Sequence, residues 1–475
     1  MSRYLLLLIG VLVFSPASLA IETISLPEMG DPSSAEITPD DERRLGESLL
    51  RWLRQNDLVE TDPLTQSYIH SLGYQLVANS DETNQPYTFF VVKDASINAF
   101  AAPGGFIGVH TGLMLTSETE SELAGVIAHE IAHITQKHMT RTYDSAKKHQ
   151  LTTAVALLAA ILVGQNVEQL TEAAIATSVA ANAQLQINFT RAHEKEADYL
   201  GIRTLANAGF DPEGMASFFE RMQKASKLYG TAPPEFLSTH PVTVNRIAEA
   251  RSRARAMPVK NVRGNQLYPF IKARIKVQNA NDIGLFIREQ LDSASSYDDP
   301  DAYQYMLAIA YLKAGSAQKA EQSITSLVKQ DNENILYRIA QAEIQQSLGQ
   351  TQKARQNFES ILALYPYSNA ITIHYGQFLL DTRQYQLAYN TLKDYLTNRE
   401  DDPLILKLLS QAAGEMGKTA EAYLYLAKHD YLNGNTRKAI TLLNTASKIT
   451  NLDYYLSAQI VAKLQEYKQI ALMEK

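Results

Sequence analysis

A repeat with a period of about 34 residues dominates the C-terminal part of this chain, which has 475 residues in all. It is marked by alanines at equal spacing, namely Ala320, Ala354, Ala388 and Ala422. Small residues of this kind lie where paired helices cross closely, and this period is that of tetratricopeptide repeats. Gly434 and Ala439 continue the pattern after only half a period, which predicts either that one helix serves two neighbouring units or that the array is capped irregularly. We therefore expect an all-α tetratricopeptide-repeat solenoid over residues 263–475, with a degenerate first repeat before residue 300 and a curved surface for a protein partner.

Composition excludes several classes of site. The chain has no cysteine, so disulfides, cysteine-ligated zinc sites and thiol nucleophiles are absent. Its formal net charge is -7 and no basic stripe dominates, so nothing points to a nucleic-acid partner. Hydrophobic residues make up 45% and charged residues 20%, which is typical of a folded chain.

The N-terminus has the pattern of a secretory signal peptide. Arg3 precedes an apolar run from Tyr4 to Phe14, and Ser18 and Ala20 are small residues at the -3 and -1 positions of a cut after Ala20. The alternative is an uncleaved membrane anchor, although the run is short for a span of about 20 residues. We expect residues 1–20 to be removed and the mature chain to lack a stable transmembrane span.

Residues 21–262 predict a mainly α domain with a small sheet. Residues 87–93 are rich in aromatic and β-branched residues, as in a strand. Residues 98–110 read as a second strand, in which Pro103 suits an edge strand or a turn. An edge at residues 98–109 would accept an extended substrate segment through main-chain hydrogen bonds.

Two further helices are expected in this region. Residues 117–141 predict a helix that begins at a capping box of Ser117 and Glu120. The Ala/Leu/Val-rich stretch 153–163 is too short to cross a bilayer. It is either a buried helix or a helix that contacts lipid or substrate.

The decisive motif is His129-Glu130-Ile131-Ala132-His133, inside the first of these helices. Histidines four residues apart share one helix face and can bind one metal ion together. Neutral imidazole suits zinc, and Glu130 can take the proton from water that attacks a peptide carbonyl. The alternative is coincidence on an ordinary helix, but a buried histidine pair and glutamate without a shared partner would be costly. We predict one zinc ion per chain.

A third protein ligand is needed, which would leave a fourth position for water. Met139 stands where the metzincin pattern has its third histidine, so a downstream carboxylate is expected. Glu194 and Asp198 are four residues apart and share a helix face, whereas Glu196 points away. The alternative is a charged face on a solvated helix.

These residues resemble the M48 family of metallopeptidases. The resemblance rests on His129, Glu130 and His133, on the later pair Glu194 and Asp198, and on the segment 97–105 before the active-site helix. It implies a zincin-type α+β domain in which Glu194 is the third zinc ligand. It also implies that Asp198 is an active-site acid, which orients a zinc ligand or donates a proton.

The whole architecture, a signal peptide, this domain and C-terminal repeats, resembles periplasmic members of the family in Gram-negative bacteria. That likeness implies a dual role in assembling outer-membrane β-barrel proteins and degrading those that stall. The implied partners are unfolded or stalled β-barrel proteins and the β-barrel assembly machinery.

One more histidine is a candidate for the site. His240 follows a loop and precedes Pro241, and Ser-Thr-His-Pro recurs in the family. His240 is either a group that reaches the zinc, as a latch in the fourth position or an oxyanion stabiliser, or a helix-start histidine with a local hydrogen bond. His110, His138, His149 and His193 are interpreted as structural or surface groups. On a straight helix His138 would face about 140° away from His133.

Two classes of function remain open. The first is an active endopeptidase with a quality-control and assembly role. The second is mainly a repeat-based binding or chaperone module with a latent peptidase site. Because Glu130 accompanies all three candidate ligands, decay of the site has no support in the sequence.

Overall fold

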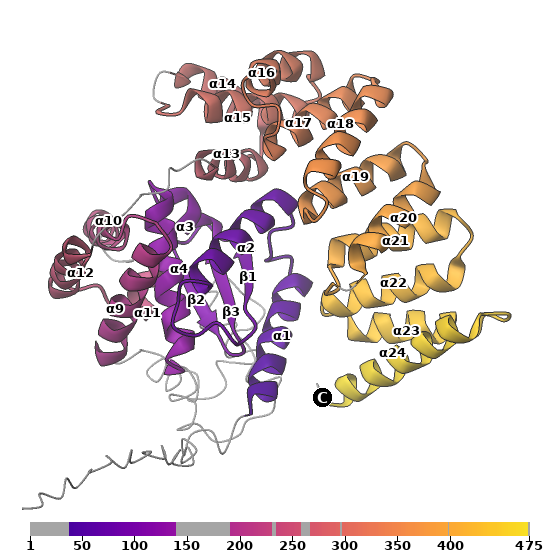
Figure 1. Cartoon of the computed structure of the whole chain (residues 1–475), viewed down its shortest axis with the longest axis horizontal. Coiled ribbons are helices and arrows are strands. Elements are labelled where there is room, and N and C mark those ends of the chain that lie inside the picture. The colour runs from indigo at the N-terminus through magenta and orange to yellow at the C-terminus, as the bar shows by residue number, and fades with distance from the viewer. Residues whose placement is uncertain are drawn as a thin grey trace, which may run out of the picture.

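The computed structural model describes residues 38–138, 191–229, 234–257, 267–294, 297–397 and 399–473 (Figure 1). The predicted signal peptide of residues 1–20, the stretch 153–163 and His149 lie outside these ranges. Within them, no helix has both the length and the apolar character that a membrane span requires. The fold is mainly helical with one small sheet, as predicted.

The N-terminal half, residues 38–257, places helices on both faces of the sheet. In chain order its elements are α1 (Pro39–Gln55), α2 (Pro63–Val77), β1 (Thr88–Val92), β2 (Ala99–Ala102), β3 (Phe106–His110), α3 (Thr111–Thr116), α4 (Glu120–Thr135), α9 (Arg191–Asn207), α10 (Glu213–Tyr229), α11 (Glu235–Thr239) and α12 (Val244–Ala256). Successive residues of a strand face opposite sides of a sheet. Accordingly Phe89 and Val91 belong to the core that contains α2 and α4, whereas Phe90 and Val92 pack with α1. The sheet therefore fixes α4 from one side.

The sheet has the strand order β1-β3-β2, with β1 parallel and β2 antiparallel to β3. Residues 98–110, predicted as one strand pattern with Pro103 at an edge or in a turn, form two strands, and the turn alternative at Pro103 is confirmed. Gly104 and Gly105 have φ angles of 75° and 84°, which only glycine adopts easily, and they turn the chain after Pro103 into a hairpin. The predicted edge is therefore β2 alone, because β3 is paired on both sides. The residues of β2 are only 1–4% exposed, and the addition of a substrate strand at this edge stays a prediction.

The helix predicted over residues 117–141 is shorter and begins later. Ser117 is the C-cap of α3, and its hydroxyl donates to the carbonyl of Leu113 at 3.0 Å. The N-cap of α4 is Thr119, which accepts a hydrogen bond from the amide of Glu122 at 3.2 Å. The predicted N-terminal cap was therefore placed two residues too early, and the Glu122 carboxylate accepts from the amide of Glu118 at 2.8 Å, so the reciprocal contact of a capping box is not made to Thr119.

The rest of the chain is a row of helices. They are α13 (Tyr268–Gln278), α14 (Ile283–Asp292), α15 (Pro300–Lys313), α16 (Ala317–Gln330), α17 (Ile335–Ser347), α18 (Thr351–Leu364), α19 (Asn369–Asp381), α20 (Tyr385–Leu396), α21 (Pro403–Glu415), α22 (Thr419–Leu432), α23 (Thr436–Ala446) and α24 (Tyr454–Met473). In this row α13 and α14 both pack against α15, and from α15 onward each helix packs against the next. This arrangement confirms the all-α solenoid. The helix α22 packs against both α21 and α23, but other helices of the array also pack against both neighbours, so the two alternatives for the half-period step stay predictions.

The repeat period has a structural basis at two positions of each repeat. Ala320, Ala354 and Ala388 are fully buried where helices cross, whereas Ala422 is only partly buried. Five residues before each of these alanines the backbone is left-handed: the residues are Gly315, Gly349, Arg383 and Gly417, with φ between 60° and 75°. The third repeat therefore keeps the turn although it lacks the glycine.

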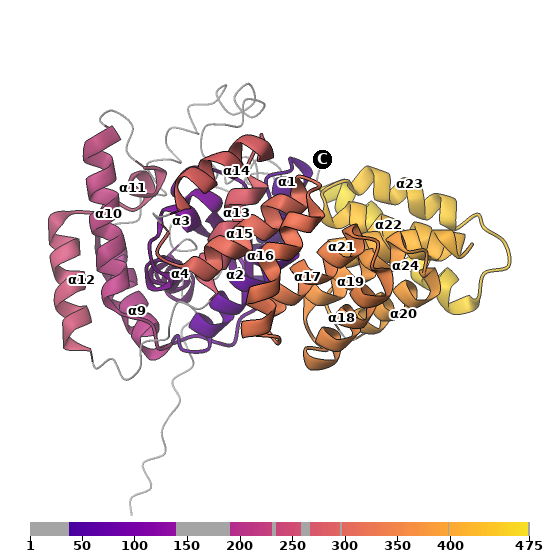
Figure 2. The ribbon, with the colours of Figure 1, turned by 90° about the horizontal axis from the view of Figure 1, so that it is seen from above.

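The repeat array contacts the N-terminal half through α13, α19 and α22, and Figures 1 and 2 show the array lying alongside that half. At its start, Arg274 on α13 forms a buried ion pair with Asp62, the N-cap of α2. Near its end, Arg51 on α1 donates to the carbonyl of Tyr431 at 2.8 Å. Because α13 contacts α2 and α3 as well as α15, the domain boundary between residues 262 and 263 stays a prediction.

Candidate metal centre

The two motif histidines lie side by side on a buried helix. His129 and His133 are 0% and 1% exposed, and their Nε2 atoms are 3.0 Å apart. Their helix α4 is buried without interruption from Ser121 to His133, between the sheet and the helices α9 and α10. Two imidazoles held this closely in a dry interior need a common partner.

The helix α9 brings two carboxylates to these histidines. Glu194 places one oxygen 3.4 Å from Nε2 of His133 and the other 3.6 Å from Nε2 of His129. Gly201 permits this approach, because a Cβ atom at that position would lie 3.1 Å from the backbone nitrogen of His129. The predicted charged face on a solvated helix is therefore wrong for Glu194 and Asp198, which are 2% and 4% exposed.

His240 approaches the same point from the opposite side. It is the C-cap of the short helix α11 and is 2% exposed. Its Nδ1 atom lies 3.0 Å from Glu194 and 3.3 Å from Nε2 of His129. The ring stacks on Phe236 with centroids 4.9 Å apart. Of the two alternatives for His240, this geometry favours the group that reaches the metal.

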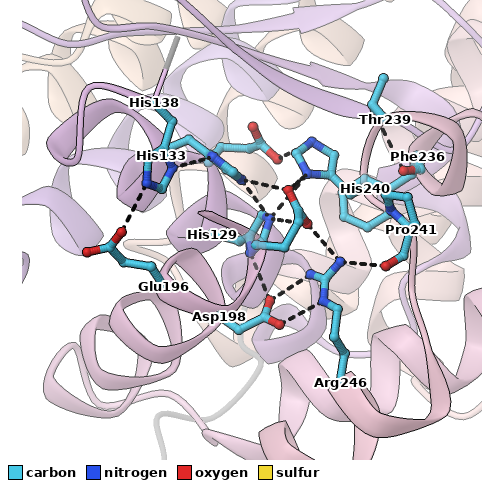
Figure 3. A network of polar contacts seen from close by, with 12 residues as sticks. His129, His133, His138, Glu196, Asp198, Phe236, Thr239, His240, Pro241 and Arg246 are labelled. Atoms are coloured by element: carbon cyan, nitrogen blue, oxygen red, sulfur yellow. Dashed lines mark hydrogen bonds and ion pairs between the residues drawn. The ribbon is translucent and has the colours of Figure 1, made fainter. Parts of the chain in front are cut away.

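Ligand atoms of His129, His133, Glu194 and His240 all lie within 4.8 Å of one another, and Figure 3 shows the three histidines converging on one point. Five of the six pairwise separations between these side chains range from 3.0 to 3.6 Å. Around a tetrahedral ion with bonds of about 2.0–2.1 Å, neighbouring ligand atoms lie about 3.3–3.4 Å apart. Three imidazoles and one carboxylate, all buried, therefore fit a tetrahedral zinc ion in both donor type and spacing.

Glu130, the residue between the two histidines in the motif, lies next to this cluster. It is 1% exposed, and one of its oxygens lies 3.5 Å from Nε2 of His240. Burial raises the pKa of Glu130 above its ordinary value, while the nearby His240 and His129 oppose the rise. A carboxylate whose pKa moves toward neutrality is suited to accept and return a proton near pH 7.

Asp198 lies behind His129 and does not face the ligand cluster. Its Oδ1 atom is 3.1 Å from Nδ1 of His129, the ring nitrogen opposite the one that faces Glu194. A carboxylate in this place fixes the tautomer and orientation of a metal-binding histidine. Of the two roles implied for Asp198, the geometry favours orienting a ligand over donating a proton to substrate.

Arg246 completes the site, and the sequence reasoning missed it. Its guanidinium contacts Glu194 at 2.7 Å, both oxygens of Asp198 at 2.7 and 2.8 Å, and the carbonyl of Pro241 at 2.9 Å. The side chain is buried, 5% exposed. The only available signal was charge balance, because buried carboxylates require a cation. No residue spacing identifies which arginine supplies it.

His138, predicted as a structural or surface group that faces away from His133, is buried and faces His133. Its Nδ1 atom lies 2.9 Å from Nδ1 of His133, and the side chain is fully buried. The predicted direction assumed a straight helix, but α4 ends at Thr135 and Lys137 has a φ of 51°. The chain therefore turns back and returns His138 to His133.

Comparison with known proteins gives a consistent result. The model of peptidase family M48 matches residues 63–254, and a tetratricopeptide repeat model matches residues 347–412. A protein of Vibrio cholerae is 35% identical over 95% of this chain and 94% of its own length. The beta-barrel assembly-enhancing protease of Escherichia coli strain K12 is 30% identical over 94% of this chain and 92% of its own. A mitochondrial metalloendopeptidase of Schizosaccharomyces pombe is 32% identical over 38% of this chain and 51% of its own.

Proposed function

This chain belongs to the peptidase family M48, and we propose that it is a zinc-dependent endopeptidase that degrades misassembled outer-membrane β-barrel proteins and assists their assembly. The observation that carries the enzymatic part is the cluster of four buried ligands, His129, His133, Glu194 and His240, with Glu130 beside it. The substrate class is taken from the name of the relative from Escherichia coli, which is similar over nearly its whole length.

Each residue has a chemical role in this proposal. When bound, zinc supplies a Lewis acid that activates water and polarises a peptide carbonyl. His129, His133 and Glu194 hold the ion, and Asp198 orients His129. Glu130 takes the proton of the attacking water and later passes it to the leaving amine. His240 holds the fourth ligand position in the resting state.

The second part of the proposal concerns place and partners. We propose that the chain acts in the periplasm after cleavage at Ala20, on the strength of the apolar run and small residues at its N-terminus. The repeat helices from α15 onward offer a long surface on which to hold a β-barrel client or the assembly machinery. A client held there would be concentrated near the peptidase site.

Digestion of an unfolded outer-membrane β-barrel protein by the purified mature chain tests the proposal. Cleavage should stop after treatment with a chelator and return when zinc is added back. An unfolded all-helical protein of the same length is the matched control client, and we expect it to be cleaved more slowly. Cleavage that survives the chelator would contradict a metallopeptidase, and equal cleavage of both clients would contradict the substrate class.

A second candidate is a binding or chaperone module with a latent peptidase site. The position of His240, within reach of both Glu194 and His129, favours it, because a fourth protein ligand excludes substrate. In that case the chain would bind the client and contain zinc, yet would not cut it.

Substitution of His240 tests whether this side chain is the latch. If His240 is a latch that is open for about 1–10% of the time, His240→Ala should raise the cleavage rate by about 10- to 100-fold. Zinc affinity should fall, because one ligand is lost. The measurement is the initial rate of client cleavage together with zinc affinity by competition with a chelating indicator. If neither the rate nor the affinity changes, His240 is not a latch.

The affinity for zinc should also depend on pH. Burial by itself lowers the pKa of His129, but Asp198 and Glu194 outweigh it and raise this pKa to about 9 in the metal-free protein. Metal binding must displace that proton, so the affinity should rise by up to about tenfold per pH unit and level off above pH 9. Glu194 does not contribute to this slope, because its pKa is held well below its ordinary value. Competition titrations between pH 6 and 9 would measure it, and a flat profile would contradict the assignment of His129.

A further inference from the structure

His133 has a polar contact on the side that faces away from the ligand cluster. Its Nδ1 atom lies 2.9 Å from Nδ1 of His138, and Nε2 of His138 lies 3.3 Å from a carboxylate oxygen of Glu196 (Figure 3). His138 is 0% exposed and stacks on His193 with ring centroids 4.2 Å apart. Three side chains therefore form a continuous line from the cluster to the surface of α9.

The backbone is bent to make this contact. After α4 ends at Thr135, Lys137 adopts a φ of 51°, which is uncommon for a residue other than glycine or asparagine. Such a conformation persists only where the surroundings hold it in place. The bend brings His138 into contact with His133, His193 and Glu196.

The proton positions follow from the proposed metal site, on which this inference rests. A histidine that binds metal through Nε2 carries its proton on Nδ1. His133 then donates from Nδ1 to Nδ1 of His138, which accepts. The proton of His138 must consequently sit on Nε2, the atom that faces the carboxylate of Glu196. The protonation state of each ring nitrogen of His133 and His138 is then fixed. Both contacts, from His133 to His138 and from His138 to Glu196, join a donor to an acceptor.

We propose that His138 is a positioning residue for His133, fixing the tautomer and ring orientation of this metal ligand, and that Glu196 completes the relay. The other motif histidine has a comparable support, because Asp198 lies 3.1 Å from Nδ1 of His129. Metal-binding histidines are generally held by a partner of this kind, and loss of that partner weakens metal affinity by about 10- to 100-fold. In this chain one histidine is supported by a carboxylate directly and the other through an imidazole.

Three variants of His138 separate a hydrogen-bond role from packing. In His138→Asn an amide oxygen takes the position of Nδ1, so the acceptor for His133 is kept. In His138→Gln the amide reaches the position of Nε2 instead, and in His138→Leu both polar contacts are lost. We expect zinc affinity near that of the wild type for the asparagine variant and about 10- to 100-fold weaker for the glutamine and leucine variants.

Zinc affinity is measured by competition with a chelating indicator, and the visible absorption of the cobalt-substituted protein reports the geometry of the ligands. The cobalt spectrum should change in the leucine and glutamine variants and be restored in the asparagine variant. Equal affinity in all four proteins, or equal loss in the asparagine and leucine variants, would overturn the proposal. If the leucine variant does not fold without metal, the asparagine and glutamine pair still decides the question.

Failure of the metal site itself would look different. Wild-type protein that binds no zinc, with the same thermal unfolding in the presence and absence of the ion, would overturn the proposed function and this inference together. Wild-type protein that binds zinc while the His138 variants bind it equally would overturn only the role of His138.

Discussion

Replacing Glu130 with glutamine is expected to lower the rate of peptide cleavage by about 10²- to 10⁴-fold, the range that a general base contributes, and to leave zinc affinity nearly unchanged. Glutamine has the same shape but cannot accept the proton of the attacking water. Glu130 is 1% exposed and does not belong to the group of four candidate ligands, so the site should keep its ion. The rate is measured on an unfolded β-barrel client at saturating zinc.

A glutamate on the same helix supplies the matched control. Glu120 lies in the first turn of α4, where its carboxylate accepts a hydrogen bond from Tyr68 at 2.8 Å. Glu120→Gln keeps an acceptor there and should cleave at nearly the wild-type rate. Loss of zinc from Glu130→Gln would show that Glu130 holds the ion, and an unchanged rate with zinc bound would exclude it as the proton acceptor.

The residues of the site that could be predicted from the sequence are those that regular helix geometry alone brings together. His129 and His133 share one helix face at a spacing of four residues, and Glu194 and Asp198 do the same. These two pairs could be predicted because each requires only one regular helix. The burial of both pairs between α4 and α9 then brings them together.

The missed contacts depend on irregular backbone or on distance along the chain. His138 was assigned to the wrong side because nothing in the sequence marks the bend at Lys137. Lysine seldom adopts the left-handed backbone conformation found there. Arg246 was missed because its partner Asp198 is 48 residues away, and no spacing rule connects them. His240 was named as a candidate, but only the fold decides which of its two roles the geometry allows.

The same distinction holds for the fold. The regular spacing of the alanines predicts the helix pairs because each repeat contacts mainly its neighbours. The left-handed turn at Arg383 is kept without glycine, so the repeat spacing and not the glycine is what identifies this turn. In contrast, the hairpin at residues 99–110 was read as one strand, because the turn residues Pro103, Gly104 and Gly105 lie inside an otherwise apolar run.

Arg246 is the residue on which the charge balance of the site depends. In the described structure it contacts Glu194 and Asp198, and both carboxylates are nearly inaccessible to water. Burial alone would raise the pKa of Asp198, but hydrogen bonds from His129 and Arg246 lower it below its ordinary value. Asp198 therefore stays ionised in the interior because a cation is present. The same guanidinium donates to Pro241, the residue after His240.

Arg246→Met should destabilise the zinc-free protein by about 3–5 kcal/mol, the usual effect of leaving a buried charge without its partner. Methionine fills a similar volume, so the loss reflects charge and hydrogen bonds more than a cavity. The matched control is Arg251→Met on the same helix, where the ion pair with Glu220 is 33% exposed on both sides and contributes at most about 1 kcal/mol. Urea unfolding of both variants with and without zinc measures the difference in the free energy of unfolding.

The double variant Arg246→Met, Asp198→Asn should recover part of the lost stability, because one uncompensated carboxylate is removed together with the cation. Equal effects of the Arg246 and Arg251 substitutions, or no recovery in the double variant, would show that the buried carboxylates do not depend on Arg246.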